Sequence, residues 1–161
     1  MTEHPIPKPE PTGIGGWLAI LVGALLFINP VMNVGGVLAN FSSAEESLPA
    51  LVDNSTWATY KMIALGGAGI GSAILFLAGV RLIDSKTPKS VDFALTALWV
   101  GGLAVPVLTL VLLALVIKQN PIGNEGQFGS MVGGLFWLVV WSLYLTRSKR
   151  VKNTYFLGTK G

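Results

Sequence analysis

The chain has 161 residues, of which 52% are hydrophobic and only 12% are charged, about half the charged fraction of an ordinary soluble domain. So few charges cannot cover a water-exposed surface, and this composition favours an integral membrane protein over a soluble one. The net charge of +3 does not indicate nucleic-acid binding, because the basic residues flank apolar segments and form no basic, aromatic-rich domain. The lack of cysteine excludes disulfides, thiolate metal sites and thiol nucleophiles.

Residues 1–16 are predicted to form a proline-rich cytoplasmic tail. Regularly spaced prolines remove backbone donors and favour an extended polyproline conformation. These prolines are Pro5, Pro7, Pro9 and Pro11. A semi-rigid spacer is favoured over a partner-binding segment, since the tail has no clean PxxP motif. The only histidine, His4, has no second ligand nearby and is predicted to be solvated.

Four apolar segments are each long enough to cross most of a hydrocarbon core about 30 Å thick, as helices that rise about 1.5 Å per residue. These predicted spans are residues 17–39, 62–80, 93–117 and 130–146. The predicted fold class is all-α, an integral membrane four-transmembrane-helix bundle that forms a single membrane domain over 1–161. The first span is too long for the apolar region of a cleaved signal peptide, which has about 7 to 15 residues.

Residues 40–57, between the first two spans, carry acidic residues and no lysine or arginine. That composition is typical of a translocated loop. Ser43 followed by Glu46 predicts a capping box for a short helix over 44–51, whose length Pro49 would limit.

The distribution of lysine and arginine predicts how the chain is threaded. Residues 1–16, 81–92 and the basic tail at 147–161 hold nine of the 11. In short segments, an excess of cations marks the cytoplasmic side of the membrane. Both termini are therefore predicted to be cytoplasmic. Within 81–92, Pro88 should keep the flanking helices apart.

Small residues in the second and third spans predict close helix packing. In the second span they recur four residues apart, at Ala64, Ala68 and Ser72 and at Gly67 and Gly71. The glycine-rich stretch at 66–71 lacks the GxGxxG spacing of a nucleotide-binding loop and is predicted to lie inside an apolar helix. Gly101 and Gly102 form a second packing notch, and Pro106 should kink the third span.

Two motifs mark the ends of the apolar region. They are Gly-Ile-Gly-Gly-Trp-Leu at 13–18 and Ser-Lys-Arg-Val-Lys-Asn-Thr-Tyr at 148–155. In both motifs the chain resembles a bacterial membrane family, catalogued as domain of unknown function 2569 (DUF2569). This family also has four predicted spans between the two motifs. The resemblance implies a multi-pass protein of the bacterial inner (cytoplasmic) membrane. It carries no catalytic residue over to this chain.

Ionisable residues are absent from the interior of the predicted spans, which limits the chemistry. Proton-coupled transporters commonly keep a carboxylate or histidine within the membrane, so that class is disfavoured. Hydrolysis, phosphoryl transfer and metal catalysis need clustered bases or ligands, whereas the carboxylates of 40–57 are predicted to be solvated. We therefore expect no enzymatic activity, no metal and no cofactor.

The candidate polar site within the membrane is Asn29, Pro30 and Asn33. Pro30 cannot donate to the carbonyl of Leu26, so the first span should bend there and leave an acceptor free. Asn29 and Asn33 lie four residues apart on one face, which should turn inward to bond a neighbouring span, a trapped water or a polar ligand. A clamp between helices is favoured over a ligand site, because hydrogen bonds between membrane helices are mostly of that kind.

The second candidate site is the basic tail, which is predicted to contact anionic phospholipid head groups or a cytoplasmic partner. Its cations are Arg147, Lys149, Arg150 and Lys152. The last helix is predicted to continue into the tail, with one face formed by Tyr144, Ser148, Val151 and Tyr155. The alternative is that these charges act only as a topology signal during insertion.

Two functions remain open. The favoured one is a binding or assembly component that packs with itself, as a homo-oligomer, or with another membrane protein. The alternative is a small transporter or pore for a small polar solute, built by oligomerisation because four short spans enclose little volume. No nucleic-acid partner is expected.

Overall fold

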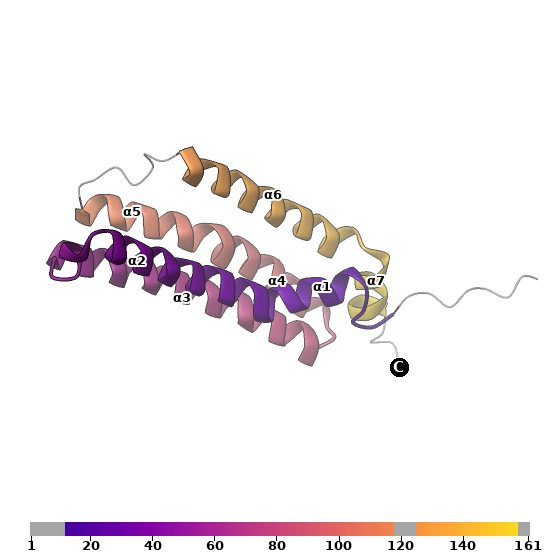
Figure 1. Ribbon diagram of the computed structural model, residues 1–161. Coiled ribbons are helices and arrows are strands. Elements are labelled where there is room, and N and C mark those ends of the chain that lie inside the picture. The colour runs from indigo at the N-terminus through magenta and orange to yellow at the C-terminus, as the bar shows by residue number, and fades with distance from the viewer. Residues whose placement is uncertain (1–11, 118–124, 158–161) are drawn as a thin grey trace, which may run out of the picture.

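The computed structural model describes residues 12–117 and 125–157 (Figure 1). Both ranges are mainly helical and neither contains a strand, so the prediction of an all-α fold is confirmed. Three helices are long and apolar enough to cross a membrane: Trp17–Ser47, Ser55–Asp84 and Pro88–Val116. A fourth helix has a shorter apolar part, Val132–Arg147.

The first helix is continuous from residue 17 to residue 47 but irregular around Pro30. It comprises α1 (Trp17–Gly23), the π-helical turn η1 (Ala24–Ile28), the π-helical turn η2 (Val31–Gly35) and α2 (Gly36–Ser47). Such wide turns occur where the regular hydrogen bonding of a helix is interrupted. Pro30 has no N–H and its ring crowds the preceding turn. The disturbance predicted at Pro30 therefore takes the form of two wide turns that flank it.

The end of the first helix differs from the prediction. Ser43 and Glu46 lie inside α2, so the predicted capping box and the short helix over 44–51 are wrong. Extending an existing helix adds a hydrogen bond per residue without a new nucleation cost, which favours continuation through these polar residues. A short 3₁₀ turn, η3 (Pro49–Leu51), follows.

The second helix, α3 (Ser55–Asp84), begins at a well-formed N-cap. Oδ1 of Asn54 accepts hydrogen bonds from two N–H groups of the first turn, at 2.9 and 3.2 Å. After a link of three residues, α4 (Pro88–Trp99) begins with Pro88 in its first turn, where a missing N–H is tolerated. The predicted separation of these helices at Pro88 is confirmed.

After α4 the chain continues through a π-helical turn, η4 (Val100–Ala104), into α5 (Val105–Ile117). The last long helix is α6 (Glu125–Arg147). The helices extend beyond the spans predicted from the sequence. The predicted spans stop at polar or charged residues, whereas helical hydrogen bonding continues through them. α3 packs against α5, α4 and the first helix, and α6 packs against α4 and η4.

Glycines bring α3 close to η4 and α5. A β-carbon on Gly71 would lie 2.9 Å from the carbonyl oxygen of Gly101, and one on Gly101 would lie 2.9 Å from that of Gly71. On the other side of η4, a β-carbon on Gly102 would lie 2.7 Å from Cδ2 of Leu138 in α6. Small residues therefore permit the close approach of backbones that helix packing in lipid requires, as the sequence predicts.

The buried core lies in the half of the bundle where the described chain begins and ends (Figure 1). Its largest fully buried side chains are Leu18, Leu21, Leu25, Leu82, Leu145, Val151 and Tyr155. The half beside residues 40–57 contributes few buried side chains, among them Phe41. The bundle therefore has a packed half and an open half.

Replacing Gly71 with alanine is expected to lower the free energy of unfolding by about 1 to 3 kcal/mol, because the added β-carbon presses on backbone that cannot easily move. Gly69→Ala is the matched control, since a β-carbon on Gly69 meets nothing within 4 Å. Thermal unfolding of both variants in one detergent measures the difference. Equal melting temperatures for the two would contradict the close contact.

Candidate functional site

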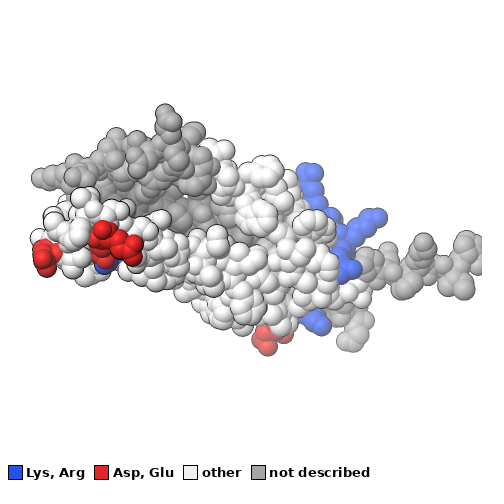
Figure 2. All heavy atoms as spheres, viewed as in Figure 1, with Lys and Arg blue, Asp and Glu red and all other residues white. Residues whose placement is uncertain are grey.

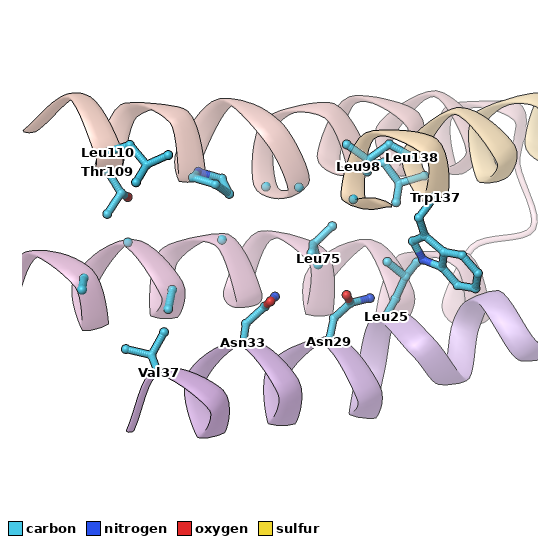
Figure 3. Close-up of a pocket in the computed structure, with 18 of the residues that line it drawn as sticks. Leu25, Asn29, Asn33, Val37, Leu75, Leu98, Thr109, Leu110, Trp137 and Leu138 are labelled. Atoms are coloured by element: carbon cyan, nitrogen blue, oxygen red, sulfur yellow. The ribbon is translucent and has the colours of Figure 1, made fainter. Parts of the chain in front are cut away.

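A cavity of about 480 Å³ lies within the bundle, bordered by the first helix, α3, η4, α5 and α6 (Figure 3). Its volume falls within the range of about 300 to 1,000 Å³ that is typical of small-molecule sites. Its lining is mainly apolar. The polar side chains that line it come mostly from the first helix.

Three asparagines of the first helix, Asn29, Asn33 and Asn40, line the cavity, and we call them the amide row. In Figure 3 the side chains of Asn29 and Asn33 both point from the first helix toward α3. Nδ2 of Asn29 donates a hydrogen bond to the carbonyl oxygen of Ala24, at 3.1 Å. The side chains of Asn33 and Asn40 form no hydrogen bond with residues 12–117 or 132–157. The amide row therefore keeps hydrogen-bonding capacity directed into the cavity.

The wall opposite the amide row has little side-chain bulk. α3 lines it with Ala64, Gly67, Ala68 and Gly71, which leaves the volume empty. On α5, Oγ1 of Thr109 donates back to the carbonyl oxygen of Val105 at 2.9 Å, so its proton is already used. The small residues that bring α3 against η4 thus also make room for the cavity.

The cavity has one closed end. Toward the packed half it is bounded by Leu21, Leu25, Leu75, Leu98 and Leu138, all of which belong to the buried core. Toward the open half it reaches Asn40, Phe41 and Tyr60. It therefore does not run through the length of the bundle.

An ion pair and an aromatic cluster tie α2 to α3 beside the open end. Oε1 of Glu45 accepts hydrogen bonds from Nζ of Lys61 at 2.6 Å and from Nε1 of Trp57 at 2.9 Å. The ring of Phe41 packs edge-on against Trp57 and Tyr60, with centroids 5.4 and 5.6 Å away. The sequence predicted Glu45 to be solvated. That prediction is wrong for this residue, because Trp57 and Lys61, in the first and second turns of the facing helix, both bind its carboxylate.

The basic tail has a different shape from the one predicted. α6 ends at Arg147, Ser148 has an extended backbone with ψ of 127°, and the short helix α7 (Lys149–Val151) and the π-helical segment η5 (Lys152–Leu157) follow. The predicted continuous helix is therefore wrong. The break lets Val151 and Tyr155 turn into the core, where both have no exposed surface, instead of lying on head groups.

The turned tail meets the start of the first helix, and we call this contact the terminal junction. The N–H of Gly13 donates to Oγ1 of Thr154 at 2.9 Å, and the hydroxyl of Tyr155 donates to the carbonyl oxygen of Leu82 at 2.7 Å. The guanidinium of Arg150 occupies the space that a β-carbon on Gly15 would need. The two end motifs are therefore neighbours in space.

Glycine is required at two positions of this junction. Gly13 has a φ of +79° and Gly16 a φ of +55°, in the left-handed region that other residues rarely adopt. The turn that they form leads the chain into α1 beneath the side chain of Arg150.

The four cations of the tail have unequal surroundings. Arg147, Lys149 and Lys152 are exposed, whereas Arg150 is only partly exposed. Figure 2 shows lysine and arginine gathered at this end of the bundle and a group of acidic side chains at the opposite end. Three of the four predicted contact residues are thus directly available to an anionic surface.

Burial raises the pKa of Tyr155 to about 12, with a smaller contribution from neighbouring Tyr144. A raised pKa means that the fold favours the neutral phenol. The contribution of the neutral Tyr155 phenol to the free energy of unfolding is complete below the ordinary tyrosine pKa of about 10. This contribution is lost as the pH rises through about 12.

Sequence reasoning missed Asn40 and the partnership of Glu45 with Lys61. Asn40 follows Asn29 by 11 residues, three helical turns, so it shares the face of the amide row once the helix continues past residue 39. The spacing was visible, but the predicted helix ended one residue too early. Among the described residues, no three histidine, aspartate or glutamate side chains gather as metal ligands would.

These observations define a small helical protein whose apolar helices are long enough to cross a membrane and whose interior holds a cavity with a row of amides. The family model described as "Protein of unknown function (DUF2569)" matches residues 11–156, and the chain belongs to this family. The match includes both motifs of the terminal junction. No curated protein and no solved structure matches the chain.

Replacing Tyr155 with phenylalanine is expected to cost about 1 to 3 kcal/mol of unfolding free energy near neutral pH, because the carbonyl of Leu82 loses its buried donor. Tyr144→Phe is the control, since the Tyr144 hydroxyl forms no hydrogen bond in the described part of the chain. The difference between wild type and Tyr155→Phe should vanish as the pH rises through about 12. A Tyr155→Phe protein as stable as wild type at neutral pH would contradict the terminal junction.

Proposed function

We propose that the protein is a non-catalytic binding component of the bacterial inner (cytoplasmic) membrane. In this proposal four spans enclose the cavity, both termini are cytoplasmic, and the cavity holds a small molecule against the amide row. The protein packs in the membrane with itself or with another membrane protein. The single observation that carries the proposal is a cavity with one closed end, lined by amides whose hydrogen-bonding capacity the described residues leave partly unused.

The amide row supports a ligand site more than a clamp between helices. A clamp needs a hydrogen bond from Asn29 or Asn33 to another span. The hydrogen bond of Asn29 instead stays within its own helix, and Asn33 has none within the described residues. Amides without partners in an apolar cavity are unfavourable, and a polar group on a ligand would relieve that cost.

The closed end supports binding over conduction. A pore within one chain would have to cross the packed half, where leucines from α1, α3, α4 and α6 meet. The alternative of an oligomeric transporter needs a pathway between chains. The cavity instead lies inside one chain, which favours a binding component.

The charges support the proposed orientation and the contact with lipid. Arg147, Lys149 and Lys152 lie exposed at one end of the bundle, and Glu46 and Asp53 lie exposed at the other. Exposed cations next to an anionic leaflet contribute about 1 kcal/mol each, so these three would hold this end against phospholipid head groups.

The orientation can be measured with a reporter that is active only outside the cytoplasm. Fusions within residues 42–53 are expected to be active, and fusions after Pro88 or after Lys152 are expected to be inactive. Because an odd number of spans would place the two ends on opposite sides, activity after Lys152 would contradict the four-span proposal.

Filling the cavity is expected to abolish binding. Ala68 lines the cavity, whereas Ala73 is exposed on the same helix, so Ala68→Trp is the test variant and Ala73→Trp its matched control. Native mass spectrometry of protein released from its own membranes should detect a bound molecule on wild type and Ala73→Trp, and none on Ala68→Trp. An identical bound mass on all three proteins would contradict the cavity as the site. Ionic current through the reconstituted wild-type protein would favour the pore.

A further inference from the structure

The cavity also indicates the class of ligand, an inference that rests on the proposed binding function. We infer that it takes one lipid acyl chain that carries a hydroxyl group near its middle, and that Asn29 and Asn33 bind this hydroxyl. Three properties lead to this inference: the volume of the cavity, the hydrogen bonds left open by the two amides, and the distance of the amides from the open end.

The volume fits one acyl chain. At about 30 Å³ for each water-sized group, 480 Å³ holds about sixteen such groups, and a methylene is similar in size to a water molecule. A helix of a partner protein is about 10 Å across, so the length from Asn29 to Asn40 alone would need about 1,200 Å³. The cavity is therefore too small for a helix and suits a single hydrocarbon chain with apolar walls around it.

The amides require a polar group on that chain. Asn29 uses one N–H for the carbonyl of Ala24, which leaves Oδ1 as an acceptor and a second N–H as a donor. Asn33 keeps its whole amide, about 6 Å further along the same helix face. A hydroxyl both donates and accepts, so it can bond an acceptor on one amide and a donor on the other. A plain hydrocarbon chain would offer no partner to Oδ1 of Asn29 or to the amide of Asn33.

The depth of the amides places the hydroxyl along the chain. Asn40 lies at the open end, beside Tyr60, and the lipid head would stay there. Along a helix, Asn33 lies about 10 Å and Asn29 about 16 Å from Asn40. A hydroxyl next to the head would stop short of both amides, whereas one near the middle of the chain reaches them.

The test uses the full-length protein in nanodiscs made from phosphatidylethanolamine and phosphatidylglycerol. A stearate with a photoreactive diazirine near its end serves as the probe, and cross-linked residues are mapped by peptide mass spectrometry. Unlabelled stearate and mid-chain hydroxystearate then compete with the probe. Labelling is expected at the cavity face of α3, within residues 64–71. Hydroxystearate should compete at a concentration about 2- to 10-fold lower than stearate, as one net hydrogen bond provides.

Two variants test whether the preference for hydroxystearate over stearate depends on the amides. Asn33→Leu, which removes an amide with no hydrogen bond in the described structure, should make the two competitors equal while cavity labelling persists. Met32→Leu is the control, because Met32 is exposed outside the cavity lining, and it should keep the preference for hydroxystearate.

The outcomes separate the inference from the proposed function. Equal competition by the two fatty acids on wild type would overturn the hydroxyl inference and leave cavity binding intact, with water as the partner of the amides. Labelling by the probe only outside the cavity would overturn both. Because the comparison on wild type decides the inference, it does not depend on whether either variant folds.

Discussion

A helix in hydrocarbon has no water to complete its backbone hydrogen bonds, and this constraint shapes the first helix more than any other part of the molecule. Pro30 interrupts the pattern, so the turns on both sides widen, and the side chain of Asn29 adds a hydrogen bond to the carbonyl of Ala24. Asn29 and Asn33 lie on either side of this proline in the sequence, and both line the cavity. A proline that is costly to the backbone therefore lies, along the chain, between two amides of the cavity lining.

The two halves of the bundle differ because their side chains differ in size. In the packed half, leucines from four helices fill the interior and the tail adds Val151 and Tyr155. In the open half, α3 presents alanine and glycine to the cavity, and most of the residues with which α5 and α6 line it are larger. The same small residues serve two purposes, since Gly71 touches η4 and also borders the cavity. The ion pair of Glu45 with Lys61 joins α2 to α3 where the core is absent.

Much of this architecture could be predicted from composition and spacing. Apolar length identified the helices, and the interval of four between Asn29 and Asn33 placed both on one face. The same reasoning failed where tertiary contacts decide local structure. The spacing of Val151 and Tyr155 fits a continued helix, but burying both side chains in the core favours a break at Ser148. The partnership of Glu45 with Lys61 joins two helices, and no periodicity within one helix reveals it.

The terminal junction has a consequence for how the protein is made. The hydrogen bond from Gly13 to Thr154 joins residues 141 positions apart, so it forms only after residue 154 has left the ribosome. The first helix is therefore made well before the tail residues that pack against its start. Because Val151 and Tyr155 belong to the buried core, closure of the packed half is a late step in the making of this protein.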